Sequence, residues 1–260
     1  MKKILQYALF LPLFAAFTAC SEDADLNNSP YAEGMGGLSL KNNTSTHITI
    51  PVITKSADFS DIDAADFYVG ILDEKGVEIK KFDTFTELLE EGQPLVLPFG
   101  TYTVISSSFK KGDTKVSEKP YFAEQRENVV IEEKKTTNVS LKCTFESIGV
   151  ELVLSEQFKK KLEEEPNNYD YKVTVSNGIA EWTFNRDKMV PGYFLDPCDE
   201  LVVTVSVRLG SSNQWYPDRI HRIKNNSASP QLGEYYIIRL DAGEEEEPYS
   251  LRTVALTEKE

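Results

Sequence analysis

The chain has 260 residues, and its 42 acidic and 28 basic side chains give a net charge of −14 at pH 7. Nucleic-acid binding relies on clustered Lys and Arg that release counterions from phosphates. The charge therefore argues against nucleic acid as a partner and against electrostatic attachment to anionic lipid. The length accommodates one large β-sandwich or two domains of ordinary size.

The first residues have the layout of a secretory signal. Met1-Lys2-Lys3 is a short basic start, and residues 4–19 carry no charge and are too few to span a bilayer comfortably. Small residues then precede Cys20, an arrangement that resembles a bacterial lipobox, in which the cysteine is acylated and becomes the first residue of the mature chain. We therefore expect a signal peptide over residues 1–19 and lipidation of Cys20. The alternative is an ordinary signal peptide followed by a chance cysteine.

An acidic stretch follows the cysteine. Ser21-Glu22-Asp23-Ala24-Asp25 resembles the surface-export signal of Bacteroidetes lipoproteins. Residues of these types cannot bury enough apolar area to fold. Residues 20–33 are therefore predicted to be a tether between the lipid and the folded chain.

Between the tether and residue 154, apolar side chains mostly alternate with polar ones, which is typical of half-buried strands. A hairpin is expected around Glu74-Lys75-Gly76, and two strands are expected to meet at the hinge Pro98-Phe99-Gly100. Strands are predicted over residues 47–55, 66–73, 77–82, 95–109, 128–132 and 137–154.

The phase of the alternation changes at Ser147. Apolar residues occupy odd-numbered positions up to Phe145 and even-numbered positions from Ile148 onward. A slip of one residue reverses the buried face, so a bulge or a passage into a new core is expected here. We place the domain boundary at this point, which predicts an N-terminal domain over 34–146 and a C-terminal domain over 147–260.

The second half continues in the same style. Asn177-Gly178 is the strongest short hairpin signal in the chain. Thr84 and Ser155 can serve as N-caps of two short helices, within residues 84–92 and 155–166. Further strands are predicted over residues 171–185, 199–210, 234–242 and 249–257. The expected fold is mainly β, with two Greek-key-like sandwiches in series and short helices only.

Several stretches carry a resemblance to a known family. They are Gly36-Gly37-Leu38-Ser39-Leu40, "ADFYVGILDEKGVEI", "LVLPFGTYTVISSSF", "KPYFAEQRENVVIEEKKTTNVSLKCTFESIGVELVLSEQF" and, late in the chain, "LGEYYIIRLDA". Their order is similar to that in a domain-of-unknown-function family of Bacteroidetes surface lipoproteins, close to the fimbrillin-like (major and minor fimbrial subunit) proteins. The resemblance is fullest over residues 34–160.

The resemblance implies two transthyretin-like β-sandwich domains on the outer surface, acting in adhesion or in fimbria assembly. Related pilins polymerise by strand exchange after an Arg-specific protease frees their first strand, and the added strand binds through backbone hydrogen bonds. The first arginine here is Arg126, far past the opening strands. The chain therefore resembles an anchor or accessory subunit, or a stand-alone adhesin, more than a shaft pilin. Residues 247–260 could be a donor strand or, more simply, the final strand of the second sandwich.

Residues that could carry catalysis are scarce. The chain has two histidines, His47 and His221, and lacks the linear motifs of zinc proteases, serine hydrolases, nucleotide-binding proteins and thiol redox enzymes. The aspartates of residues 58–66 could bind a hard cation, but without EF-hand spacing they indicate a polar turn. Glu244–Glu247 indicates a solvated loop. We expect no enzyme activity, no cofactor and no metal site.

Residues 210–226 are the best binding candidate. The segment joins Trp215 and Tyr216 to several basic residues in an acidic protein, and aromatic rings beside arginine are favoured at binding surfaces. Aromatic faces also stack on sugar rings, so a glycan is a candidate ligand. The alternative is that Trp215 tucks under a long loop. The candidate ligand-binding residues are Trp215, Tyr216, Arg219, His221 and Arg222.

Three other residues bear on the fold. Trp182 alternates with Phe184 and is expected in a core. Cys143 and Cys198 could form a disulfide in the oxidising envelope or stay reduced and buried, and the sequence leaves both open.

Together these observations predict a non-enzymatic, lipid-anchored protein of the outer membrane, exposed on the cell surface. It would act in adhesion or as an anchor or accessory subunit of fimbriae. The alternative is a glycan-binding lipoprotein of a polysaccharide-uptake system. The expected partners are the outer membrane through the lipid, and either fimbrial subunits bound by strand exchange or a host or bacterial surface glycan or protein.

Overall fold

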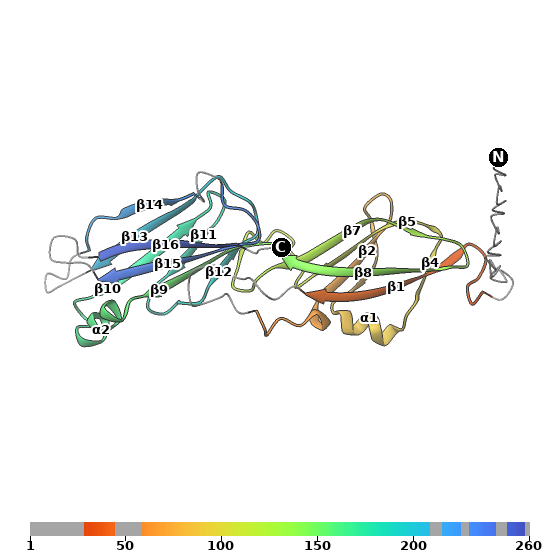
Figure 1. Ribbon diagram of the computed structural model, residues 1–260, viewed down its shortest axis with the longest axis horizontal. Helices are drawn as coiled ribbons and strands as arrows, with labels where there is room; N and C mark the ends of the chain where they lie inside the picture. The colour runs from red at the N-terminus through yellow and green to blue at the C-terminus, as the bar shows by residue number, and fades with distance from the viewer. Residues whose placement is uncertain (1–28, 45–58, 209–214, 225–228, 243–248, 258–260) are drawn as a thin grey trace, which may run out of the picture.

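The computed structural model describes residues 29–44, 59–208, 215–224, 229–242 and 249–257. Two β-sheet bodies follow one another along the long axis of the molecule (Figure 1). The helices of the described residues are α1 (Phe85–Glu91), α2 (Glu156–Glu164) and the 3-10 turn η2 (Ala64–Asp66). The predicted fold class, mainly β sandwiches with short helices, is confirmed.

The N-terminal body is built on a seven-stranded sheet with the order β3-β2-β5-β7-β8-β1-β4. Its strands are β1 (Met35–Thr44), β2 (Tyr68–Leu72), β3 (Glu78–Phe82), β4 (Leu95–Pro98), β5 (Gly100–Ser107), β7 (Phe122–Ile131) and β8 (Thr136–Phe145). β7 and β8 pair at only two positions, Phe122 with Phe145 and Ala123 with Thr144. Beyond these pairs the strands separate, and both halves of the sheet contribute to one core, with Leu38 and Leu141 from one half and Val69 and Val104 from the other.

β1 lies inside this sheet and runs parallel to β8. The two strands are in register over eight pairs, from Gly37 opposite Thr136 to Thr44 opposite Cys143. On its other side β1 pairs antiparallel with β4.

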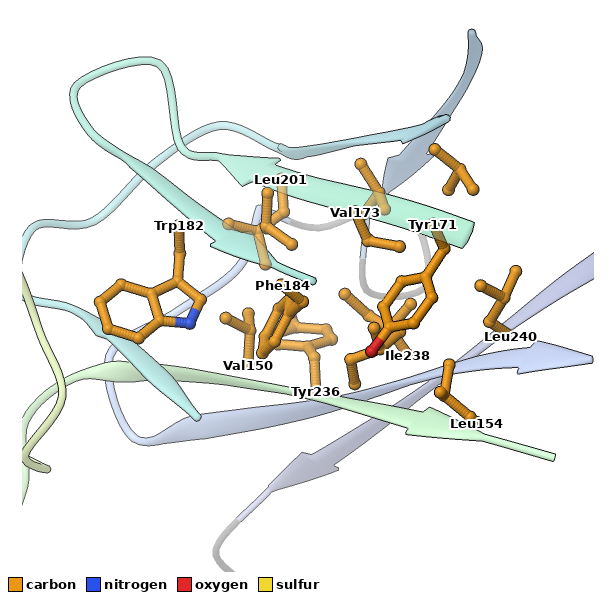
Figure 2. Packing of buried hydrophobic residues seen from close by; sticks show 14 of the residues in the cluster. Val150, Leu154, Tyr171, Val173, Trp182, Phe184, Leu201, Tyr236, Ile238 and Leu240 are labelled. Atoms are coloured by element: carbon orange, nitrogen blue, oxygen red, sulfur yellow. The ribbon is translucent and has the colours of Figure 1, made fainter. Parts of the chain in front are cut away.

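The C-terminal body is a sandwich of two sheets. The four-stranded sheet has the order β11 (Glu181–Phe184), β10 (Asp170–Ser176), β13 (Leu201–Arg208), β14 (Arg219–Ile223). The five-stranded sheet has the order β16 (Tyr249–Thr257), β15 (Glu234–Ala242), β9 (Ile148–Leu154), β12 (Gly192–Phe194), β6 (Val116–Ser117). Figure 2 shows Tyr171 and Phe184 of the first sheet meeting Tyr236 and Ile238 of the second. Trp182 is 6% exposed in this core, as predicted.

β6 joins the two bodies because it belongs to the loop between β5 and β7 but pairs with β12, Val116 opposite Phe194. The same loop is held by charge: Lys111 Nζ lies 3.1 Å from one carboxylate oxygen of Asp196 and Lys115 Nζ lies 3.2 Å from the other. The domain boundary between residues 146 and 147 stays a prediction. β6 precedes this boundary in the chain but pairs with a strand that follows it.

Aromatic rings fill the contact between the two bodies. We call Phe59, Phe67, Phe122, Phe145, Tyr193 and Tyr235, with Cys143 and Ile237, the junction cluster. The Phe145 ring lies 5.1 Å from that of Phe59 and 6.1 Å from that of Tyr193, centroid to centroid. A Cβ atom on Gly149 would lie 2.2 Å from the Tyr235 ring, so only glycine allows this approach.

Local predictions can be compared with the described residues. Thr84 and Ser155 accept hydrogen bonds from backbone N–H groups in the first turns of α1 and α2, which confirms both caps. The hairpins at Gly76 and Gly178 are confirmed, and both glycines have positive φ values (75° and 82°). Residues 47–55 lie outside the described residues. β1 as a whole, β6, β12 and β14 were not predicted from the alternation.

Cys143 and Cys198 are free, and they pack in different clusters. Cys143 lies in the junction cluster, and burial raises the pKa of its thiol to about 11. Cys198 packs against the C-terminal core.

Among the residues that the structure describes, none of the helices has the length and apolar character needed to cross a membrane.

Candidate functional site

The predicted ligand-binding residues lie along β14 and just before it. β14 forms the edge of the four-stranded sheet, next to β13, so part of the candidate segment 210–226 is a strand. β13 ends at Arg208, which is in register with Asp170, the first residue of β10 after α2. We call this end of the C-terminal sandwich the distal end, because Figure 1 shows α2 at one end of the long axis and the start of β1 at the other.

Trp215 and Tyr216 are both half-exposed at the distal end, 48% and 42% respectively. The Tyr216 N–H donates to the Val207 carbonyl (2.8 Å), and Trp215 forms an isolated bridge with Arg208. The Arg208 guanidinium carbon lies 5.8 Å from the centroid of the Trp215 ring. Backbone pairing and this cation–π contact therefore hold the indole at the surface rather than under a loop.

A row of charged side chains supports the indole. An Arg208 nitrogen lies 3.6 Å from Asp170 Oδ2, and Arg186 Nε donates to Asp170 Oδ1 (3.2 Å). Asp218 accepts a hydrogen bond from the Ser206 hydroxyl (2.6 Å) on the same strand as Arg208. Arginine and carboxylate groups are thus fixed beside a half-exposed aromatic ring.

The other predicted residues do not all converge on this ring. His221 is opposite the buried Val203, so it points toward the core and is only partly exposed. Its Nε2 atom has no hydrogen-bond partner among the residues that the structure describes. Burial together with the neighbouring Arg219 lowers the pKa of the imidazole. Arg222 forms an ion pair with Glu200.

Arg219 is exposed at the start of β14. The next residue, Ile220, is 61% exposed and faces away from the core beside Thr204. Sequence reasoning missed Ile220, and it also missed Arg208, Asp170 and Asp218. Only Arg208 carried a signal, because it continues the outward positions of the alternating run that forms β13.

The remaining candidates of the sequence have structural roles or lie outside the description. Asp63 accepts a hydrogen bond from the Ala65 N–H (2.9 Å) and caps η2, so this part of residues 58–66 is a capped polar turn. In the described part of the chain, no group of three or more His, Cys, Asp or Glu side chains could hold a metal ion. Cys20, His47 and Glu244–Glu247 lie outside the described residues.

A cleft of about 710 Å³ opens beside the junction. Its walls come from β5, β7 and β8 on one side and from Leu195 and Leu232 on the other. The Glu124 carboxylate accepts the N–H of Lys142 at the point where β7 and β8 separate, so it satisfies a group that the ladder leaves open. The Glu124 carboxylate in the wall of this cleft therefore has a structural role.

The fold places the chain in the class of two-body β-sandwich proteins, here with a half-exposed aromatic ring at the distal end. The chain belongs to a family described as a domain of unknown function (DUF4493), whose family model matches residues 34–257. This family membership confirms the predicted resemblance.

Several solved structures are similar to this chain. Two of them, from Bacteroides uniformis and Bacteroides ovatus, are among those described as putative cell adhesion proteins. The one from Bacteroides uniformis is 12% identical, covers 86% of this chain and 99% of its own, and has a TM-score of 0.45. The one from Bacteroides ovatus is 10% identical, covers 88% and 99%, and has a TM-score of 0.43. The tip fimbrial protein Mfa3 of Porphyromonas gingivalis is 8% identical, covers 75% and 96%, and has a TM-score of 0.39. No curated protein matches this chain.

Proposed function

We propose that this chain is a lipid-anchored protein of the outer membrane, exposed on the cell surface, that acts in adhesion or as an anchor or accessory subunit of fimbriae. It has no enzymatic role in this proposal. The lipid on Cys20 holds the N-terminal end at the membrane, and the distal end presents Trp215 to a partner.

One observation carries the proposal. The chain enters the folded body at the end where β1 begins, and α2 lies at the opposite end of the long axis (Figure 1). The half-exposed Trp215 belongs to that opposite end, because it bridges to Arg208, which is in register with Asp170 at the start of β10. The junction cluster and β6 hold the two bodies together between these ends. A molecule tethered at Cys20 would therefore carry its exposed aromatic ring away from the membrane.

The test of the anchor is the mass of the N-terminal peptide of protein from the native outer membrane. An acylated peptide that begins at Cys20 supports the proposal, and an unmodified Cys20 within a longer or differently cut chain contradicts it. Unboiled SDS gels of the same material separate the fimbrial forms. A ladder indicates polymerisation by strand exchange, whereas a single species indicates an anchor subunit or adhesin.

The test of the distal end uses the soluble chain of residues 21–260 on an array of bacterial and host glycans and on immobilised bacterial cells. Trp215→Ala should weaken binding by about tenfold or more, since central aromatic residues carry a large share of interface energy. Phe99→Ala is the matched control, because it removes another exposed ring at the other end of the molecule. Equal binding by both variants would contradict the assignment of the site.

A glycan ligand is the second candidate, in a surface lipoprotein of a polysaccharide-uptake system. It is favoured by the packing of Trp215, whose ring is braced by Arg208 yet remains half-exposed. Aromatic rings that present an apolar face beside fixed polar groups suit the mixed surface of a sugar. Binding to the glycan array but not to protein-coated surfaces would select this candidate.

A further inference from the structure

The N-terminal end of the molecule also exposes an aromatic ring. Phe99 lies in the turn between β4 and β5, and its side chain is 62% exposed. Its N–H donates to the Gly34 carbonyl (2.9 Å), so this turn is bonded directly to the segment that follows the predicted tether. The Tyr102 hydroxyl donates to the Pro98 carbonyl (2.8 Å) and braces the turn from inside.

A second apolar side chain accompanies Phe99. Val130 is 52% exposed on β7, where it is in register with Thr101, two residues beyond Phe99. The turn between β7 and β8 lies at the same end, because the Lys134 N–H donates to the Met35 carbonyl (2.7 Å). Phe99 and Val130 therefore belong to one rim, which we call the proximal rim.

The charges of the turn between β7 and β8 balance. Glu132 and Glu133 are matched by Lys134 and Lys135 in the same turn, and Lys135 forms an ion pair with Glu132 (2.5 Å). The chain as a whole carries a net charge of −14. This turn is thus neutral in sum, and it lies at the same end as the exposed side chains of Phe99 and Val130.

The start of the folded chain fixes how far this rim can be from a lipid on Cys20. Ser29 is bound to the same turn, since its hydroxyl donates to the Lys134 carbonyl (3.0 Å). Only nine residue steps separate Cys20 from Ser29. A fully extended chain of that length reaches about 30 Å.

We propose that the proximal rim contacts the lipid surface, with Phe99 inserted at the boundary between the headgroups and the acyl chains, and that this contact sets the direction in which the molecule points. The inference rests on the proposed lipid anchor at Cys20. A single aromatic ring does not hold an acidic protein at a membrane by itself. A short tether makes the contact intramolecular and raises its effective concentration, so a weak contact becomes populated. Apolar side chains such as that of Phe are buried at the boundary between the headgroups and the acyl chains when a protein lies on a membrane.

Fluorescence of a tethered protein tests this contact. Residues 1–20 are replaced by a histidine tag, and residues 21–260 are bound to uncharged phosphatidylcholine vesicles that contain a small fraction of nickel-chelating lipid. Phe99→Trp reports the rim, and Ile179→Trp, at a 57% exposed position in the turn between β10 and β11, is the matched control. Emission of the unsubstituted protein gives the contribution of Trp182 and Trp215.

Lipids with brominated acyl chains should quench the Phe99→Trp emission at least twofold more than that of Ile179→Trp. Equal quenching of the two variants would overturn the proposal. So would a blue shift of Phe99→Trp that depends on protein concentration without vesicles, because it would mean that a second copy covers the rim. The histidine tag replaces the lipid, so an unacylated Cys20 in native protein refutes the anchor alone. Acylated Cys20 without quenching refutes the lipid contact alone.

Discussion

The junction and the distal end are both rich in aromatic residues, but the rings are buried at the junction and half-exposed at the distal end. In the junction cluster, Phe122 is fully buried and Phe145 is 2% exposed, whereas Trp215 and Tyr216 at the distal end are 48% and 42% exposed. Burying a ring of this size contributes about 1.5–3 kcal/mol to folding. An exposed ring forgoes most of that gain. Rings at the junction therefore stabilise the molecule, and the rings at the distal end are available to a partner.

Truncating a junction ring should give the largest effect. Phe145→Ala leaves a cavity among Phe59, Phe122 and Tyr193, and it should lower the free energy of unfolding by about 3–5 kcal/mol. Trp215→Ala should change it by about 0.5 kcal/mol. Urea unfolding of both variants measures the difference. Similar losses would remove the distinction between the two regions.

Adding a methyl group at the junction should have an intermediate effect. Gly149→Ala places a Cβ atom against the Tyr235 ring and should lower the free energy of unfolding by about 1–3 kcal/mol. The double variant Gly149→Ala, Tyr235→Leu is the control, because a smaller partner relieves the overlap. The losses of the single variants Gly149→Ala and Tyr235→Leu should therefore add up to more than the loss of the double variant. Simple additivity would show that the ring does not need this close approach.

The smallest effect should come from pH at the distal sheet. Burial and Arg219 lower the pKa of His221 below its usual 6.5, so the unfolded chain takes up a proton that the folded chain resists. Stability contributed by the neutral imidazole is therefore lost as pH falls through 6.5 toward the lower folded pKa. His221→Gln should show a smaller fall in the urea midpoint between pH 7.5 and 5.5 than the unsubstituted protein. Parallel curves would mean that His221 titrates alike in both states.

Local features could be predicted from the sequence because neighbouring residues determine them. The alternation of apolar residues located β5, β10 and β13, and the cap residues located α1 and α2. The alternation of Trp182 with Phe184 on one strand correctly placed the indole in the core. β14 was missed because His221 and Arg219 occupy its inward positions, which hides the apolar alternation. A strand at the edge of a sheet tolerates such residues.

Contacts between distant segments could not be predicted in this way. The junction cluster brings Phe59, Phe122, Phe145, Tyr193 and Tyr235 together from separate parts of the chain. A two-residue period shows which face of a strand is apolar, but not which other face covers it. The same holds for Asp170 and Arg208, whose contact depends on the register between β10 and β13.

The parallel pairing of β1 with β8 has a mechanical consequence. In the proposed anchored molecule, a force between the membrane and a partner at the distal end would act on this body at two points. These are the start of β1 and the end of β8, where the chain continues into β9. The two strands run in the same direction over eight pairs, so this tension would act along them and load their hydrogen bonds in shear. The bonds would share the load and fail together instead of unzipping one after another. The interior position of β1 in the sheet, between β8 and β4, would thus make this strand resistant to a pulling force.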